Sequence, residues 1–223
     1  MTVLHLADEG EAADLAAFLS RLLHYDRGAA VRIQAAGTAL AVFGRPPSFE
    51  VLAIRAVRLA KPYEDGPAAA LDVTVSAGEL LESVDEPAST AVVPAAVTGP
   101  PWAGVLPPRG GWRPEPGLPA PDALRAAVGA AVAEFRSRTE ELAPQQRTRA
   151  EVDRIGREIW SRTIGGTGLP VRVVHAAQSL GFLRPEGDDP ALFTSGAWLR
   201  LRTPYGSVAV RRAGREALGV SVR

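Results

Sequence analysis

The chain has 223 residues and a mass of 23.4 kDa, which is enough for one large domain or two small ones. Hydrophobic residues make up 46% of the sequence and charged residues 22%, a globular composition that excludes a wholly disordered chain. There is no cysteine, so disulfides, thiolate catalysis and cysteine-ligated metals are excluded.

The sequence predicts a cytoplasmic protein with no membrane partner. The N-terminal segment MTVLHLADEGE is acidic and lacks the basic region of a secretory signal, and no run of 18 apolar residues could span a membrane. Arginine supplies 24 of the 25 basic residues, a bias that GC-rich codons produce and that suggests a bacterial source. It therefore weakens any argument that arginine was selected for binding phosphate.

Charge is unevenly distributed although the formal net charge is zero. Residues 1–120 carry 9 basic and 14 acidic groups, whereas residues 121–223 carry 16 basic and 11 acidic groups. An acidic half joined to a basic half suggests two units with different partners.

The first part of the chain combines helical and strand patterns. Apolar residues recur at helical spacing from Leu15 to Leu23 and predict a helix over residues 9–25. Period-two alternation then predicts a run of strands, at residues 31–36, 39–44, 49–60, 71–75 and 91–93. Ser76 and Glu79 have capping-box spacing and predict a short helix to about residue 83. Together these elements predict an α+β domain over residues 1–93, with helices beside a mainly antiparallel sheet.

Residues 94–121 have a different composition, with nine prolines and five glycines among 28 residues. Such a segment is typical of an extended linker. It also contains Trp102 and Trp112, and exposed indoles in a free tether would be costly. We expect the segment to lie against one or both domains with the two rings as anchors. The alternative is a docking peptide for a partner protein.

Residues 122–223 begin with three predicted helices, at about residues 122–142, 148–164 and 170–180. Thr148 and Glu151 have capping-box spacing at the start of the second helix, and Gly181 is a candidate left-handed cap after the third. The chain then predicts two strands, 198–202 and 208–211, joined by the turn sequence Thr203-Pro204-Tyr205-Gly206.

Three helices followed by a β-hairpin is the order of elements in a winged helix-turn-helix. In that fold the third helix enters the major groove and the hairpin touches the DNA backbone. The turn predicted at residues 163–169 is longer than the usual three or four residues, which argues against insertion into the groove. No match to a particular family motif accompanies this order.

The predicted third helix carries one polar row. Arg172, His175 and Gln178 share a face, and arginine and glutamine can read guanine and adenine respectively. The alternative interpretation is an ordinary solvated helix face.

The predicted hairpin carries the stronger signal. Pairing Leu199 with Val210 and Leu201 with Val208 makes one face apolar, and the opposite face then carries Trp198, Arg200, Arg202 and Arg211. Like charges across a strand pair are destabilising, so an anion should lie nearby. That anion is either a nucleic-acid phosphate or a carboxylate such as Asp188 or Asp189.

No pattern for catalysis is present, so we expect neither an enzyme nor a bound cofactor or metal. The three histidines, His5, His24 and His175, are scattered, and the common catalytic and phosphate-binding motifs are absent. The sequence therefore predicts a two-domain regulatory protein that binds duplex DNA through a C-terminal winged-helix-like domain. Its N-terminal domain would support dimerisation or ligand sensing. The alternative is a non-enzymatic protein-interaction protein with the same module.

Overall fold

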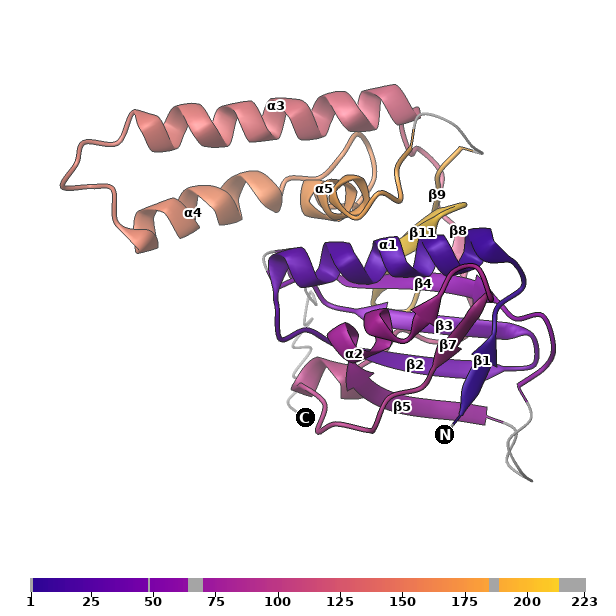
Figure 1. Cartoon of the computed structure of the whole chain (residues 1–223). Helices are drawn as coiled ribbons and strands as arrows, with labels where there is room; N and C mark the ends of the chain where they lie inside the picture. The colour runs from indigo at the N-terminus through magenta and orange to yellow at the C-terminus, as the bar shows by residue number, and fades with distance from the viewer. Residues whose placement is uncertain (1, 48, 64–69, 185–188, 213–223) are drawn as a thin grey trace, which may run out of the picture.

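The computed structural model describes residues 2–47, 49–63, 70–184 and 189–212. It is a mixed α+β fold with a large antiparallel sheet, as predicted (Figure 1). The helices are α1 Glu9–Tyr25, α2 Ala77–Glu82, α3 Pro121–Glu140, α4 Arg149–Trp160 and α5 Val171–Ser179, with a 3₁₀ turn η1 at Pro101–Gly104. The strands are β1 Val3–His5, β2 Ala30–Ala36, β3 Ala39–Gly44, β4 Leu52–Arg58, β5 Ala70–Ser76, β6 Val84–Asp85, β7 Thr90–Val92, β8 Arg113–Pro114, β9 Ala191–Ser195, β10 Trp198–Thr203 and β11 Gly206–Arg211.

One eight-stranded sheet joins the two parts of the chain, in the order β5-β2-β3-β4-β11-β10-β9-β8. The junction is the antiparallel pair β4–β11, in which Val208 lies opposite Ala53. A small second sheet has the order β1-β7-β6. The predicted hairpin is therefore not a separate wing, because each of its strands has a second partner in the large sheet.

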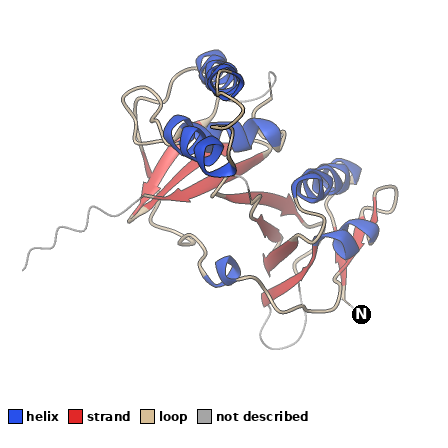
Figure 2. Cartoon of the chain, turned by 90° about the vertical axis from the view of Figure 1, so that its left-hand side faces the viewer, coloured by secondary structure: helices blue, strands red, loops and turns tan. Residues whose placement is uncertain are grey.

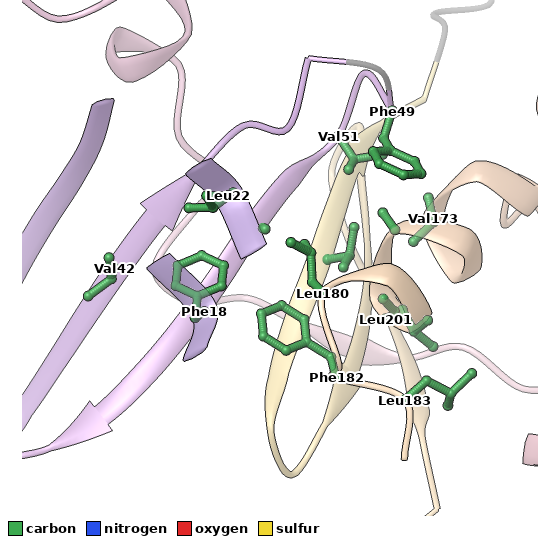
Figure 3. Close-up of a cluster of buried hydrophobic side chains, with 14 of the residues drawn as sticks. Phe18, Leu22, Val42, Phe49, Val51, Val173, Leu180, Phe182, Leu183 and Leu201 are labelled. Carbon is green, nitrogen blue, oxygen red and sulfur yellow. The ribbon is translucent and has the colours of Figure 1, made fainter. Parts of the chain in front are cut away.

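A single cluster of buried side chains extends across both parts of the chain. Figure 3 shows where Phe18 and Leu22 of α1 approach Leu180 and Phe182, which follow α5. The Phe18 and Phe182 rings stack with their centroids 5.5 Å apart. The two predicted domains, residues 1–93 and 122–223, share one core in this structure, because the common sheet brings both sets of apolar residues to one face.

The α-helices cover that face of the sheet, and η1 lies on the other side (Figure 2). The apolar stripe of α1 is buried as its spacing predicts, with Leu15, Phe18 and Leu19 at most 1% exposed. Both predicted capping serine and threonine side chains accept a backbone hydrogen bond, Ser76 from Glu79 and Thr148 from Glu151. Gly181 has φ +72°, the left-handed conformation expected after α5.

A buried arginine ties the hairpin to the N-terminal helix. Arg55 on β4 is only 5% exposed, and it donates to the backbone carbonyl of Tyr205 in the hairpin turn at 2.7 Å. Its guanidinium also pairs with Glu11 and Asp14 of α1, at 3.0 Å and 3.2 Å. The turn that would form the tip of a wing is thus bound to α1 and β4.

The Pro-rich segment, residues 94–121, crosses the face of the sheet that the α-helices leave open. Trp102 and Leu106 pack there against Phe43, Leu52 and Ile54. The carbonyl oxygen of Ala103 accepts a hydrogen bond from Arg32 on β2. The prediction that this segment lies against the folded chain is confirmed, although both tryptophans are only partly buried.

Among the helices of the described ranges, none combines the length and apolar character needed to cross a membrane.

Candidate nucleic-acid interface

The structure distributes the three predicted α5 residues over different environments. His175 stacks on Trp160 with centroids 4.7 Å apart and meets Phe49 edge-on at 5.0 Å. Burial lowers the pKa of His175. Arg172 is half-buried, and its Nε has no hydrogen-bond partner within the described residues. Only Gln178 is exposed, so these three side chains do not form one open polar row.

The hairpin has the predicted register. Leu199 lies opposite Val210 and Leu201 opposite Val208, and all four side chains are at most 4% exposed. Arg200, Arg202 and Arg211 therefore project from the other side of the strands, which we call the arginine face. Arg202 and Arg211 are exposed, and Arg200 is half-buried.

The two predicted sets of residues lie on opposite sides of the sheet. Helix α5 packs on β11 through the apolar face of the hairpin, where Val173 and Leu201 belong to the common core (Figure 3). The arginine face points away from α5 because successive strand residues alternate sides. A single ligand therefore cannot contact α5 and the arginine face in the manner of a winged helix unless the domains rearrange.

Arg200 occupies an unusual environment for a cation. Its Nε donates to the Ser207 hydroxyl at 2.9 Å, which fixes the guanidinium over the sheet. Burial lowers the pKa of Arg200, and the charge of neighbouring Arg202 lowers it further. An anion would lower the free energy of this site, because desolvating an unpaired charge is costly.

Several arginines elsewhere in the described structure have the carboxylate partners that the arginine face lacks. Arg32 pairs with Asp72 at 2.7 Å, and Arg138 pairs with Glu158 at 2.7 Å. The hydrogen bonds from Arg138 and Arg162 lower the pKa of Glu158 to about 2. By contrast, residues 190–212 contain four arginines and no acidic residue.

The carboxylates considered as partners from the sequence do not fill this role in the described structure. Asp188 lies outside the described residues. Asp189 is exposed, and no ion pair within the described ranges joins it to the arginine face. The three arginines of that face thus have no carboxylate partner in the part of the chain that the structure describes.

Aromatic side chains accompany the arginines. Phe193 on β9 lies directly opposite Arg200, and its ring centroid is 5.4 Å from the guanidinium carbon of Arg202. The Trp112 ring centroid is 5.7 Å from the guanidinium carbon of Arg200. Trp198 lies opposite Arg211 in the hairpin ladder.

Sequence reasoning missed the contribution of Phe193 and placed Trp112 only as an anchor. The alternating Leu192-Phe193-Thr194 next to Gly196 was the available signal for a strand before the hairpin. No pattern in the sequence indicated that the Pro-rich segment would bring Trp112 to Arg200, because that contact joins residues 88 positions apart.

Other parts of the molecule offer less chemistry. A groove of about 720 Å³ lies between the ends of β2 and β3 and the Pro-rich segment; its lining includes Asp26, Arg45, Ser76 and Trp102. The exposed His24 meets Tyr25 edge-on, far in sequence from any second histidine. Over the described residues, no group of three or more histidine and carboxylate side chains could hold a metal ion.

Comparison with known families divides the chain at the Pro-rich segment. Residues 1–104 are similar to a family described as a domain of unknown function, DUF8010. Residues 107–215 are similar to a second domain of unknown function, DUF8185. No curated protein matches the chain. The chain therefore has a two-domain layout in which both domains resemble families of unknown function, and strands from both domains join in the large sheet.

Proposed function

We propose that the protein binds nucleic acid through the arginine face, and that residues 122–223 form a winged-helix-like unit that presents it. The observation that carries the proposal is the group of three arginines, Arg200, Arg202 and Arg211, without a carboxylate partner within the described residues. A phosphate backbone supplies the missing anions in a row, and arginine contacts phosphate oxygens with two N–H groups at once.

The winged-helix-like part of the proposal rests on the order of elements. Three helices, α3 to α5, precede the strands β9 to β11, and a short antiparallel bridge joins Thr163 to Pro170 between α4 and α5. The unit departs from a winged helix at the hairpin turn, which Arg55 holds from β4 and Arg184 covers at 3.9 Å from the Tyr205 ring. The geometry therefore favours binding by the sheet rather than by α5 and a wing tip.

The test is a salt titration of nucleic-acid binding by the full chain and by the triple variant Arg200→Gln, Arg202→Gln, Arg211→Gln. We expect micromolar binding by the unaltered protein at about 50 mM salt and none by the variant. The slope of log affinity against log salt should fall by about 0.9 for each lost contact to duplex DNA.

The matched control removes the same charge from the other side of the molecule. Arg136, Arg149 and Arg157 are exposed on α3 and α4, and the corresponding triple glutamine variant should bind as the unaltered protein does. The thermal midpoint of the hairpin variant should stay unchanged or rise, because exposed charges contribute little to folding and Arg200 is desolvated without an anion. Failure of the folded, unaltered protein to bind any nucleic acid at about 50 mM salt would overturn the proposal.

A second candidate function is protein recognition through the Pro-rich segment. Val97 and Val105 on this segment are 40% and 53% exposed, and Val97 lines the groove beside the segment. Under this alternative, substituting Val97 and Val105 by serine should abolish capture of a partner, and the arginine variant should have no effect on it.

A further inference from the structure

We infer that the arginine face is built for single-stranded nucleic acid, so that it should prefer single strands to duplex DNA. The inference rests on the proposed function and specifies its substrate class. It is carried by the three aromatic side chains around the arginines, Phe193, Trp198 and Trp112, which come from β9, β10 and the Pro-rich segment.

The arrangement alternates cationic and aromatic groups across neighbouring strands. Arg200 lies directly opposite Phe193 on β9, and Trp198 lies directly opposite Arg211 on β11. The Trp112 ring lies beside Arg200 on the arginine face, and its indole Nε1 donates to the carbonyl of Pro108 at 3.0 Å. That hydrogen bond fixes the ring within the Pro-rich segment.

This combination suits unpaired bases rather than a double helix. In a duplex the π-faces of the bases are stacked on one another, so an aromatic side chain on a sheet can meet phosphate, sugar and base edges but no π-face. In a single strand each base offers its π-face to an aromatic or arginine plane, while the neighbouring phosphates need cations. Arginines alone would serve a duplex equally well, so the partly exposed aromatic rings are what distinguish the two substrates.

Trp198 belongs to the same apolar cluster as Trp102 and Leu106, at the edge of the open part of the sheet. Trp102 and Leu106 cover the outer face over β3 and β4, whereas the described segment leaves Arg202 and Arg211 exposed on β10 and β11. A strand of nucleic acid would therefore lie along β10 and β11, beside the Pro-rich segment and with Trp112 at its border.

The experiment compares the full chain with 12-nucleotide oligo(dT), oligo(U) and a mixed-sequence DNA duplex of equal phosphate number, by fluorescence anisotropy at about 50 mM salt. We expect at least tenfold tighter binding of one or both single strands than of the duplex. Duplex binding that equals or exceeds both single strands would overturn this inference and leave the proposed function intact. Binding to none of the three would overturn both.

A pair of variants at Trp112 separates stacking from structure. Trp112→Ala and Trp112→Phe both lose the hydrogen bond to Pro108, but only the alanine variant loses the ring. We expect about tenfold weaker binding of the single strand by Trp112→Ala, with an unchanged salt slope, and nearly full affinity for Trp112→Phe. Arg202→Gln should instead reduce the salt slope by about 0.7. Equal affinity of Trp112→Ala and the unaltered protein, with both folded by circular dichroism, would show that the ring does not stack on a base.

Discussion

Arg55 on β4 and Arg200 on β10 belong to one sheet, with β11 between their strands, but they project from opposite faces. Arg55 points toward α1, where Glu11 and Asp14 neutralise its charge and offset the free-energy cost of desolvating its guanidinium. Arg200 points to the outer face, where a serine hydroxyl is its partner and burial lowers its pKa. The same residue type therefore has a structural role on one face and a proposed binding role on the other.

The free energy of unfolding should depend on pH through the protonation of His175. Its ring stacks on Trp160 and meets Phe49 edge-on, and burial lowers its pKa from the ordinary value of 6.5. Protonation then favours the unfolded chain. The stabilising effect is present above about pH 6.5 and is lost as the pH falls through the lower pKa of the folded state.

We expect the substitution His175→Phe to weaken this pH dependence. The thermal midpoint of the unaltered protein should fall more steeply between pH 7 and pH 5 than that of the variant, since phenylalanine keeps the aromatic packing without a titrating group. Calorimetry at several pH values measures it, with the exposed His24→Phe as the control. Parallel pH profiles for His175→Phe and the unaltered protein would show that the folded state does not disfavour a charge at this position.

At the scale of elements, the Pro-rich segment acts as part of the fold. Its η1 turn places Trp102 against Phe43 and Ile54, and Arg32 binds the carbonyl of Ala103. Farther along, β8 adds two residues to the edge of β9. A segment without helix or long strand thus closes the sheet face over β3 and β4, because its side chains supply the apolar contacts and its carbonyls accept hydrogen bonds.

Trp102→Ala should lower the free energy of unfolding by about 1–3 kcal/mol. This is less than the loss for a fully buried tryptophan because the ring is only partly buried. Urea unfolding measures the change. Val105→Ala, at a position 53% exposed on the same segment, is the control and should alter stability by less than about 0.5 kcal/mol. An unchanged midpoint for Trp102→Ala would mean that the segment is detached from the sheet in solution.

At the scale of the whole molecule, the pairing of β4 with β11 joins strands from the two domains in one sheet. Three residue pairs join these strands, and the shared core lies beneath them. Arg184, which follows α5, also pairs with Asp14 of α1 at 3.0 Å. Separating the two parts would expose an unpaired strand edge together with apolar side chains, and such edges pair with other chains.

We therefore expect that neither residues 1–104 nor residues 107–215 fold alone as stable monomers. Produced separately, each fragment should aggregate or fail to show a cooperative thermal transition. Mixed during refolding, the two should form a one-to-one complex. Size-exclusion chromatography with light scattering and circular dichroism provides the measurement. Two monomeric fragments that each unfold cooperatively would contradict the single shared core.

The sequence by itself determined the local elements. The spacing of Leu15 to Leu23 predicted a helix near residues 9–25, where α1 lies, and the alternation in 198–211 predicted the hairpin register and the face on which Arg200 and Arg202 lie. Periodicity and capping are properties of neighbouring residues, so a single sequence reveals them. The short strand β1 was missed because three residues hold too little pattern.

Only the tertiary structure decided how these elements meet. The pairing of β4 with β11 joins residues about 150 positions apart, and the contact of Trp112 with Arg200 joins residues 88 positions apart. Such contacts depend on which apolar faces bury one another, and no local pattern specifies the partner. For the same reason the sequence predicted that Arg172, His175 and Gln178 form one polar row able to read bases, whereas in the structure Phe49 and Trp160 pack on the central residue, His175.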